Sequence, residues 1–154
     1  MKCSIAAAIL GWVLVASAVA ESPLIAEIRL DANSAKCMSG QPNKAVEMSL
    51  SHVRKFKILP GLSDKSLVSL EAVGFTGCYV RHQKFVFYLH PRPKQLSPLF
   101  DSDATFKMVQ GDGDKVRFEA SNYPGKFITV RDDGAVLLTK DPSPDQSTFV
   151  LKKE

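Results

Sequence analysis

Apolar and polar residues alternate along three segments that resemble one another. The segments are residues 28–32, 68–72 and 116–120, and each has an acidic residue in its fourth place and alanine in its fifth. Alternation with a period of two places every second side chain on the same face, which is typical of a half-buried β-strand. We therefore predict three equivalent strands, each of which opens a repeat.

A second apolar pattern recurs about 30 to 40 residues after each opening strand. Residues 56–61 match residues 106–111, and residues 149–151 match the start of both. The opening strands are 40 and 48 residues apart, and the closing strands are 50 and 43 residues apart. Two elements with a similar period indicate true internal repetition. The repeats span approximately residues 26–61, 66–111 and 114–153.

Each repeat has room for two more strands between its opening and closing strand. Residues 78–82 and 85–90 are expected in the second repeat, residues 126–130 and 135–139 in the third, and residues 45–50 in the first. Prolines gather before the closing strands, where they suit loops because proline lacks a ladder donor. Four strands in each of three repeats predict an all-β fold, a β-trefoil with six strands in a barrel and three hairpins over one end. A divergent β-sandwich is the alternative.

The first 20 residues have the layout of a secretory signal peptide. Lys2 precedes an apolar stretch that is too short to span a membrane, and Ala18-Val19-Ala20 forms a small-x-small cleavage site. We expect a secreted, extracellular product made of one domain, residues 21–154. The net charge of the chain is +4 and falls to +3 without Lys2. A net charge this small gives no sign of a nucleic-acid partner.

Two cysteines, Cys37 and Cys78, remain after removal of this signal. In an oxidising compartment they either form a disulfide or stay as two buried thiols, and the sequence leaves both readings open. The histidines do not stand at metal-ligand spacings with them, so we expect neither a metal site nor a cofactor.

The second repeat carries a family resemblance. Residues 69–82 read Ser-Leu-Glu-Ala-Val-Gly-Phe-Thr-Gly-Cys-Tyr-Val-Arg-His, and residues 99–106 read Leu-Phe-Asp-Ser-Asp-Ala-Thr-Phe. This order resembles the arabinose-binding module of α-L-arabinofuranosidase B, whose repeats carry Asn-Tyr-Pro-Gly-x-Tyr-Leu-Arg-His and then Phe-x-x-Asp-Ala-Thr-Phe. Residues 121–127 of the third repeat, Ser-Asn-Tyr-Pro-Gly-Lys-Phe, resemble it too. The resemblance implies a β-trefoil carbohydrate-binding module.

The resemblance also implies a sugar site in the second repeat, with His82 and Asp103 as polar ligands and Phe75 as the ring platform. Such groups suit a sugar because a carboxylate accepts two hydroxyl hydrogen bonds and an aromatic face covers the apolar side of the ring. Supporting roles fall to Tyr79, Arg81 and Thr105. The alternative is structural: Asp103 and Thr105 satisfy backbone groups at a turn, and Arg81 is an ion-pair partner.

The other two pockets lack the family's ligands. The third repeat keeps Tyr123 but has Val130 in place of histidine and Gln146 in place of aspartate. The first repeat has Val53 at the aspartate position and no Arg-His pair. We therefore expect one site, and a degenerate pocket around Tyr123.

Catalysis is not expected. A glycosidase needs two carboxyl groups about 5–10 Å apart. Asp101 and Asp103 would lie about 6.5–7 Å apart on a strand, but they fall in a loop that enters a strand. The family's catalytic domain is separate, so an arabinofuranosidase label reaches this chain only by inheritance. The expected partner is an arabinose-containing polysaccharide or another extracellular glycan. Two alternatives are a trefoil recruited as a protein ligand or inhibitor, and a glycosaminoglycan binder that uses Arg54, Lys55, Lys57, Lys152 and Lys153.

Overall fold

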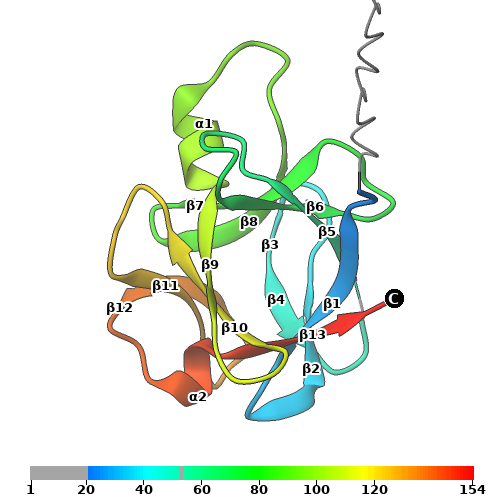
Figure 1. The fold of residues 1–154 in the computed structure, drawn as a ribbon, viewed down its shortest axis with the longest axis vertical. Coiled ribbons are helices and arrows are strands. Elements are labelled where there is room, and N and C mark those ends of the chain that lie inside the picture. Colours follow the sequence, from blue (N-terminus) through cyan, green and yellow to red (C-terminus); the bar gives the residue numbers. More distant parts are fainter. Residues whose placement is uncertain (1–20, 53) are drawn as a thin grey trace, which may run out of the picture.

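Thirteen strands and two short helices follow one another in the part of the chain that the computed structural model describes, residues 21–52 and 54–154 (Figure 1). The predicted signal peptide and Val53 lie outside these residues. The strands are β1 (Leu24–Leu30), β2 (Asn33–Ser39), β3 (Lys44–Ala45), β4 (Glu47–Ser49), β5 (Lys55–Pro60), β6 (Val68–Ala72), β7 (Cys78–Gln83), β8 (Val86–Pro91), β9 (Phe106–Gln110), β10 (Lys115–Ala120), β11 (Lys126–Val130), β12 (Val136–Lys140) and β13 (Phe149–Lys153). The helices are α1 (Pro98–Asp103) and α2 (Pro144–Ser147).

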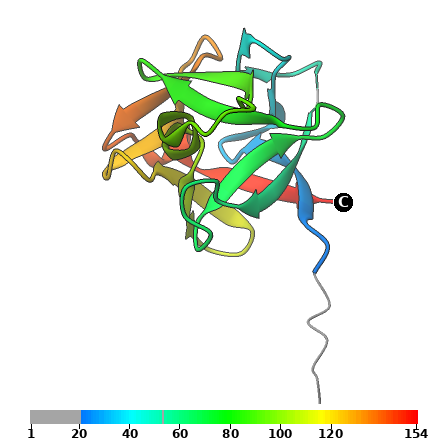
Figure 2. The same cartoon turned by 90° about the horizontal axis from the view of Figure 1, so that it is seen from above.

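The opening and closing strands of the three repeats form a closed ring. Antiparallel pairs run in the order β1–β5–β6–β9–β10–β13 and return to β1. The pairs β2–β4, β7–β8 and β11–β12 form three hairpins outside the ring. Strand β8 joins them by pairing with both β3 and β12 (Figure 2). This architecture confirms the predicted β-trefoil.

Three phenylalanines at equivalent positions of the closing strands fill the centre of the ring. All three are fully buried, and each lies opposite one residue from each of the two opening strands beside it. Phe56 pairs with Ala26 and Ala72, Phe106 with Val68 and Ala120, and Phe149 with Leu30 and Val116. The threefold repetition of the sequence therefore becomes a threefold layer in the core.

These pairings correct the alignment of the first repeat. Because Leu30 occupies the place of Ala72 and Ala120, the equivalent opening segment is 26–30 and not 28–32. Strand β1 ends at Leu30, and Ala32 lies exposed in the turn that follows. A shift of two residues preserves a period-two pattern, so alternation alone could not set the register.

The two helices were not predicted, because six and four residues are too few to show a helical period. Both begin at a proline that was predicted to lie in a loop, Pro98 in α1 and Pro144 in α2. Proline suits this position because its ring presets the helical φ and its missing N–H has no partner to lose there. In α1, the Ser97 hydroxyl accepts a hydrogen bond from the Phe100 N–H at 3.4 Å, which caps the first turn.

Cys37 and Cys78 are free thiols, and both are buried. They lie on β2 and β7, two strands that belong to different hairpins and do not pair with each other. Of the two readings left open by the sequence, the structure has the buried thiols and not the disulfide. No helix in the described ranges is long and apolar enough to cross a membrane.

Candidate functional site

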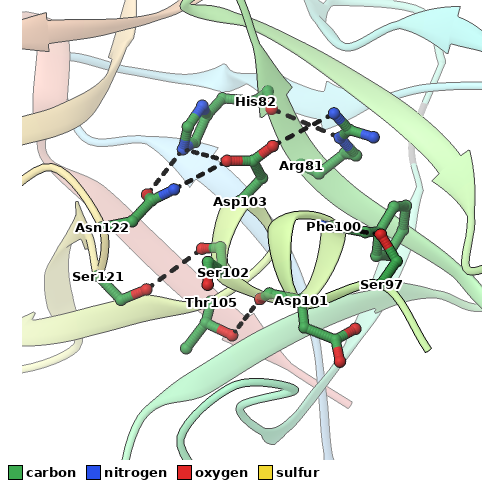
Figure 3. Close-up of polar contacts among 10 residues, drawn as sticks. All are labelled: Arg81, His82, Ser97, Phe100, Asp101, Ser102, Asp103, Thr105, Ser121 and Asn122. Atoms are coloured by element: carbon green, nitrogen blue, oxygen red, sulfur yellow. Dashed lines mark hydrogen bonds and ion pairs between the residues drawn. The ribbon is translucent and has the colours of Figure 1, made fainter.

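A buried carboxylate, Asp103, binds three side chains from other parts of the chain (Figure 3). Its Oδ1 accepts a hydrogen bond from Asn122 Nδ2 at 2.8 Å and lies 3.5 Å from His82 Nε2. Its Oδ2 accepts from Arg81 Nη2 at 3.2 Å. Asp103 and His82 are only 5% and 3% exposed, so these contacts are largely shielded from solvent. We call these four residues the Asp103 cluster.

Three separate elements bring the Asp103 cluster together. Asp103 is the last residue of α1, Arg81 and His82 are neighbours on β7, and Asn122 lies in the turn between β10 and β11. The cluster thus combines the second repeat with the opening turn of the third. Asn122 belongs to the third-repeat motif, and no role was predicted for it because each pocket was expected to be built within one repeat.

The hydrogen bonds show which atoms of the Asp103 cluster donate a proton and which accept one. Asn122 donates to Asp103 through its amide nitrogen, so its Oδ1 faces His82 Nε2, 3.0 Å away. An amide oxygen only accepts, and therefore Nε2 carries a proton and donates it. Among the described residues, Asp103 Oδ2 has one hydrogen-bond partner, Arg81, although a carboxylate oxygen can accept two bonds. One acceptor position on Asp103 is thus left for another donor.

The Asp103 cluster lies beside a cavity of about 290 Å³. Its polar side chains come from Arg81, His82, Gln83, Lys84 and Asp103, and its large apolar side chains from Phe85, Leu99 and Tyr123. The Tyr123 ring meets the His82 ring edge to face, with 5.4 Å between centroids. Tyr123, which was predicted to lie in a degenerate third pocket, therefore belongs to the cavity of the second repeat.

Phe75 does not line this cavity, so its predicted place beside His82 and Asp103 is corrected. It lies in the turn between β6 and β7, packs against the core, and the Arg54 guanidinium carbon stands 4.5 Å from its ring centroid. The reason is the same displacement by one repeat. The aromatic residue after an opening strand contacts the preceding repeat, so Tyr123 meets His82 while Phe75 meets Arg54.

The three residues predicted to support the ligands have structural contacts. Tyr79 packs with Phe100 beneath α1, and burial raises the pKa of its hydroxyl. Thr105 Oγ1 donates to the Asp101 carbonyl at 2.7 Å and accepts from the Ser63 N–H at 3.1 Å, so it satisfies backbone groups as the structural alternative held. Arg81 is the ion-pair partner of Asp103, and it also lines the cavity.

Asp101 and Asp103 do not form a pair of facing carboxylates. They belong to α1 and not to a loop that enters a strand. Asp101 binds Arg92 through two hydrogen bonds of 2.9 and 2.8 Å, and Figure 3 shows its carboxylate pointing away from the Asp103 cluster. The distance expected for two side chains on the same face of a strand therefore does not apply to these two carboxylates.

Within the described residues, neither of the other two repeats has an equivalent of the Asp103 cluster. In the third repeat, Val130 is buried in the core, and Gln146 lines a cavity of about 420 Å³ beside Asp132 and Asp133. In the first repeat, a cavity of about 520 Å³ is lined by residues that include Lys44, Glu47, His52 and Arg54. No group of three or more His, Cys, Asp or Glu residues suited to a metal ion occurs within the described ranges.

Comparison with known proteins gives one family and a common fold. The family model of the alpha-L-arabinofuranosidase B (ABFB) domain matches residues 29–150. A solved GH54 arabinofuranosidase soaked with a cyclic sulfate inhibitor has a TM-score of 0.75 and 16% identity, over 86% of this chain and 31% of that one. An arabinofuranosidase complexed with arabinofuranosyl-alpha-1,2-xylobiose has a TM-score of 0.71 and 15% identity, over the same shares of both chains.

A designed threefold-symmetric protein, ThreeFoil, has a TM-score of 0.65 and 11% identity, over 83% of this chain and 97% of its own. No curated protein matches the sequence. The chain spans about a third of the length of the arabinofuranosidases that it resembles. At these identities the solved structures support the fold, and the family comes from the match over residues 29–150.

Proposed function

The chain belongs to the alpha-L-arabinofuranosidase B (ABFB) domain family of carbohydrate-binding modules, and from this premise we propose that it binds arabinofuranose-containing glycans in the cavity beside the Asp103 cluster, without hydrolysing them. One observation carries the proposal. A fixed carboxylate with a spare acceptor position stands next to aromatic and aliphatic side chains in a cavity of about 290 Å³. This is the combination that a sugar needs, because its ring has hydroxyl groups around an apolar face.

The Asp103 cluster would recognise the positions of sugar hydroxyl groups without a change in its own conformation. Asp103 is held from two sides by Arg81 and Asn122, so a sugar hydroxyl that donates to Oδ2 would meet an acceptor of fixed direction. Preorganised groups lose little freedom when a ligand binds. Tyr123 stands beside His82 at the edge of the cavity and would cover one face of the sugar.

Binding without hydrolysis follows from the charges around the cavity. Of the described residues that line it, only Asp103 is acidic. The neighbouring carboxylate, Asp101, is bound to Arg92 and points away from the Asp103 cluster (Figure 3). Both known glycosidase geometries require a second carboxyl group across the sugar. We expect purified protein to release no sugar from arabinofuranosides.

Titration with methyl α-L-arabinofuranoside tests the proposal. A single pentose makes few contacts, so we expect a dissociation constant near ~1 mM, which corresponds to about −4 kcal/mol. NMR shifts should concentrate at His82, Asn122 and Tyr123. Asp103→Asn should abolish measurable binding, because a charge-assisted hydrogen bond contributes about 1.5–3 kcal/mol.

Asp145→Asn is the matched control. Asp145 also belongs to a short helix before a closing strand, but it is exposed and lies in the third repeat. It should bind like the wild type. No binding by the wild type at tens of millimolar, or equal binding by Asp103→Asn, would refute the proposed site. We also propose that the protein is secreted, and the mass of protein recovered from the medium should correspond to a chain that begins at Glu21.

A further inference from the structure

Exposed apolar side chains gather around the proposed sugar cavity. Five large hydrophobic residues are exposed within the described ranges, and three of them line this one cavity: Phe85 at 42%, Leu99 at 68% and Tyr123 at 41%. They come from the β7–β8 turn, from α1 and from the β10–β11 turn. We call these three residues the apolar rim.

One member of the apolar rim occupies an unfavourable backbone conformation. Strand residues Gln83 and Val86 pair directly, so Lys84 and Phe85 form a two-residue turn, and both have positive φ values, 51° and 63°. Such turns favour asparagine and glycine, and a bulky residue in this region is an outlier. The corresponding hairpin of the third repeat places glycine, Gly134, at its positive φ of 87°. The chain therefore carries a phenylalanine where the backbone alone favours glycine.

Neighbouring side chains hold the Phe85 ring at the cavity. Its centroid is 5.5 Å from that of Tyr123 in an edge-to-face arrangement, and Lys126 Nζ lies 4.0 Å from the Phe85 centroid. Lys126 Nζ is also 5.5 Å from the Tyr123 centroid, so one amine contacts both rings. Contacts of this kind favour a defined ring position.

The apolar rim exceeds what a pentose can cover. A single furanose has one small apolar face, and Tyr123 beside His82 suffices for it. With a single pentose bound, Phe85 and Leu99 would stay in contact with water. Together they form an apolar surface, although they come from different elements of the fold. An apolar surface that adjoins a polar cavity is typical of a site that binds a ligand with both kinds of group.

We infer that the ligand of this site is an arabinofuranoside that carries an aromatic group directly attached to the sugar, with the furanose at the Asp103 cluster and the aromatic group on Phe85 and Leu99. This inference rests on the proposed function and specifies its ligand class. A flat ring attached to the sugar suits this cavity because two aromatic rings and a leucine line it. Offset or edge contacts between rings stabilise a complex beyond the burial of apolar area.

Two glycosides that share the sugar test the inference. Methyl and 4-nitrophenyl α-L-arabinofuranoside differ only in the attached group, and 4-nitrophenol alone measures binding without sugar. We expect the aryl glycoside to bind about tenfold more tightly than the methyl glycoside, since burying part of an aromatic ring gives an effect of this size. 4-Nitrophenol should not bind measurably at the same concentrations.

Three variants assign the effect to the apolar rim. Leu99→Ala and Phe85→Gly should each reduce the aryl preference, which is the ratio of the two affinities, to about threefold or less. Leu50→Ala is the matched control, because Leu50 is also 68% exposed but lies in the first repeat, and it should keep the full preference. Phe85→Gly should fold at least as well as the wild type, because glycine accepts a positive φ without strain.

The results separate the two proposals. Equal affinities for the two glycosides would overturn the aromatic ligand class and leave the sugar site intact. An aryl preference that survives in both Leu99→Ala and Phe85→Gly would overturn the assignment to the apolar rim. Binding of neither glycoside would refute the proposed function itself.

Discussion

Replacement of Asp103 by asparagine should destabilise the fold as well as remove the proposed ligand contact. The substitution keeps the shape of the side chain and removes its charge. The new amide has one acceptor and one donor group, whereas Arg81 and Asn122 both donate to this position. At least one of these donors therefore loses its partner or meets another donor.

The burial of the pair determines the size of the effect. The side chains of Arg81 and Asp103 are 14% and 7% exposed, so loss of the carboxylate leaves a largely buried guanidinium without its counter-charge. Removing one partner of such a pair costs about 3–5 kcal/mol. Because the amide oxygen still accepts one bond, we expect the lower end, about 3 kcal/mol. For a domain of about 130 residues this lowers Tm by about 10 °C.

Thermal unfolding followed by far-UV circular dichroism at pH 7 measures this change. Asp112→Asn is the surface control, because Asp112 is exposed in the turn between β9 and β10, and its Tm should stay within about 1 °C of the wild type. A decrease of less than about 2 °C for Asp103→Asn would refute the reasoning, because it would mean that the Asp103 cluster contributes little beyond what a neutral amide supplies.

Three further predictions concern other parts of the fold. Burial lowers the pKa of His90 below its usual value near 6.5, so the unfolded state gains a proton first as the pH falls, and stability is lost below about pH 6.5. His90→Gln should therefore lose less stability than the wild type between pH 7 and 5 in urea titrations. An equal loss of stability in both proteins would contradict this. Burial raises the pKa of the Cys37 and Cys78 thiols, so both should react slowly with maleimide in the folded protein and rapidly in denaturant without a reductant, whereas unreactive cysteines in denaturant would indicate a disulfide. A Cβ atom at Gly61 would lie 2.4 Å from the carbonyl oxygen of Asp64, so Gly61→Ala should lower the urea midpoint by an amount equivalent to about 1–3 kcal/mol, and an unchanged midpoint would show that the loop adjusts freely.

The strand pattern was readable from the sequence because alternation reports directly on which side chains face the core. Phe56, Phe106 and Phe149 marked equivalent places, and all three are fully buried. The register of the first repeat was not readable, since a shift of two residues keeps the same face buried. Ala32 illustrates this: it matches Ala72 in the sequence and Leu30 takes that place in the structure.

The site was predictable in part for a related reason. His82 and Asp103 were recognised from residue order, and the structure brings them together although 21 residues separate them. Asn122 and Tyr123 complete the cavity from the next repeat, and no local pattern reports on a contact between turns of different repeats. The same limit explains Phe75, which has the expected residue type but contacts Arg54 of the preceding repeat. The turn at Phe85 was hidden as well, because its left-handed backbone contradicts the usual residue preference.

The pairing of β1 with β13 brings the first and last strands of the described domain side by side, so that its two ends lie close together. Residues Ala26–Leu30 pair with Phe149–Lys153, and the Glu154 N–H donates to the Ile25 carbonyl at 3.1 Å. A short linker could therefore join the two ends, and a new opening at the exposed β9–β10 turn would give a circular permutant with every strand pair of the ring preserved. Both ribbon views place these ends on the side opposite α1 and β11 (Figures 1 and 2). A tether or fusion partner attached there would leave the cavity facing away from the support.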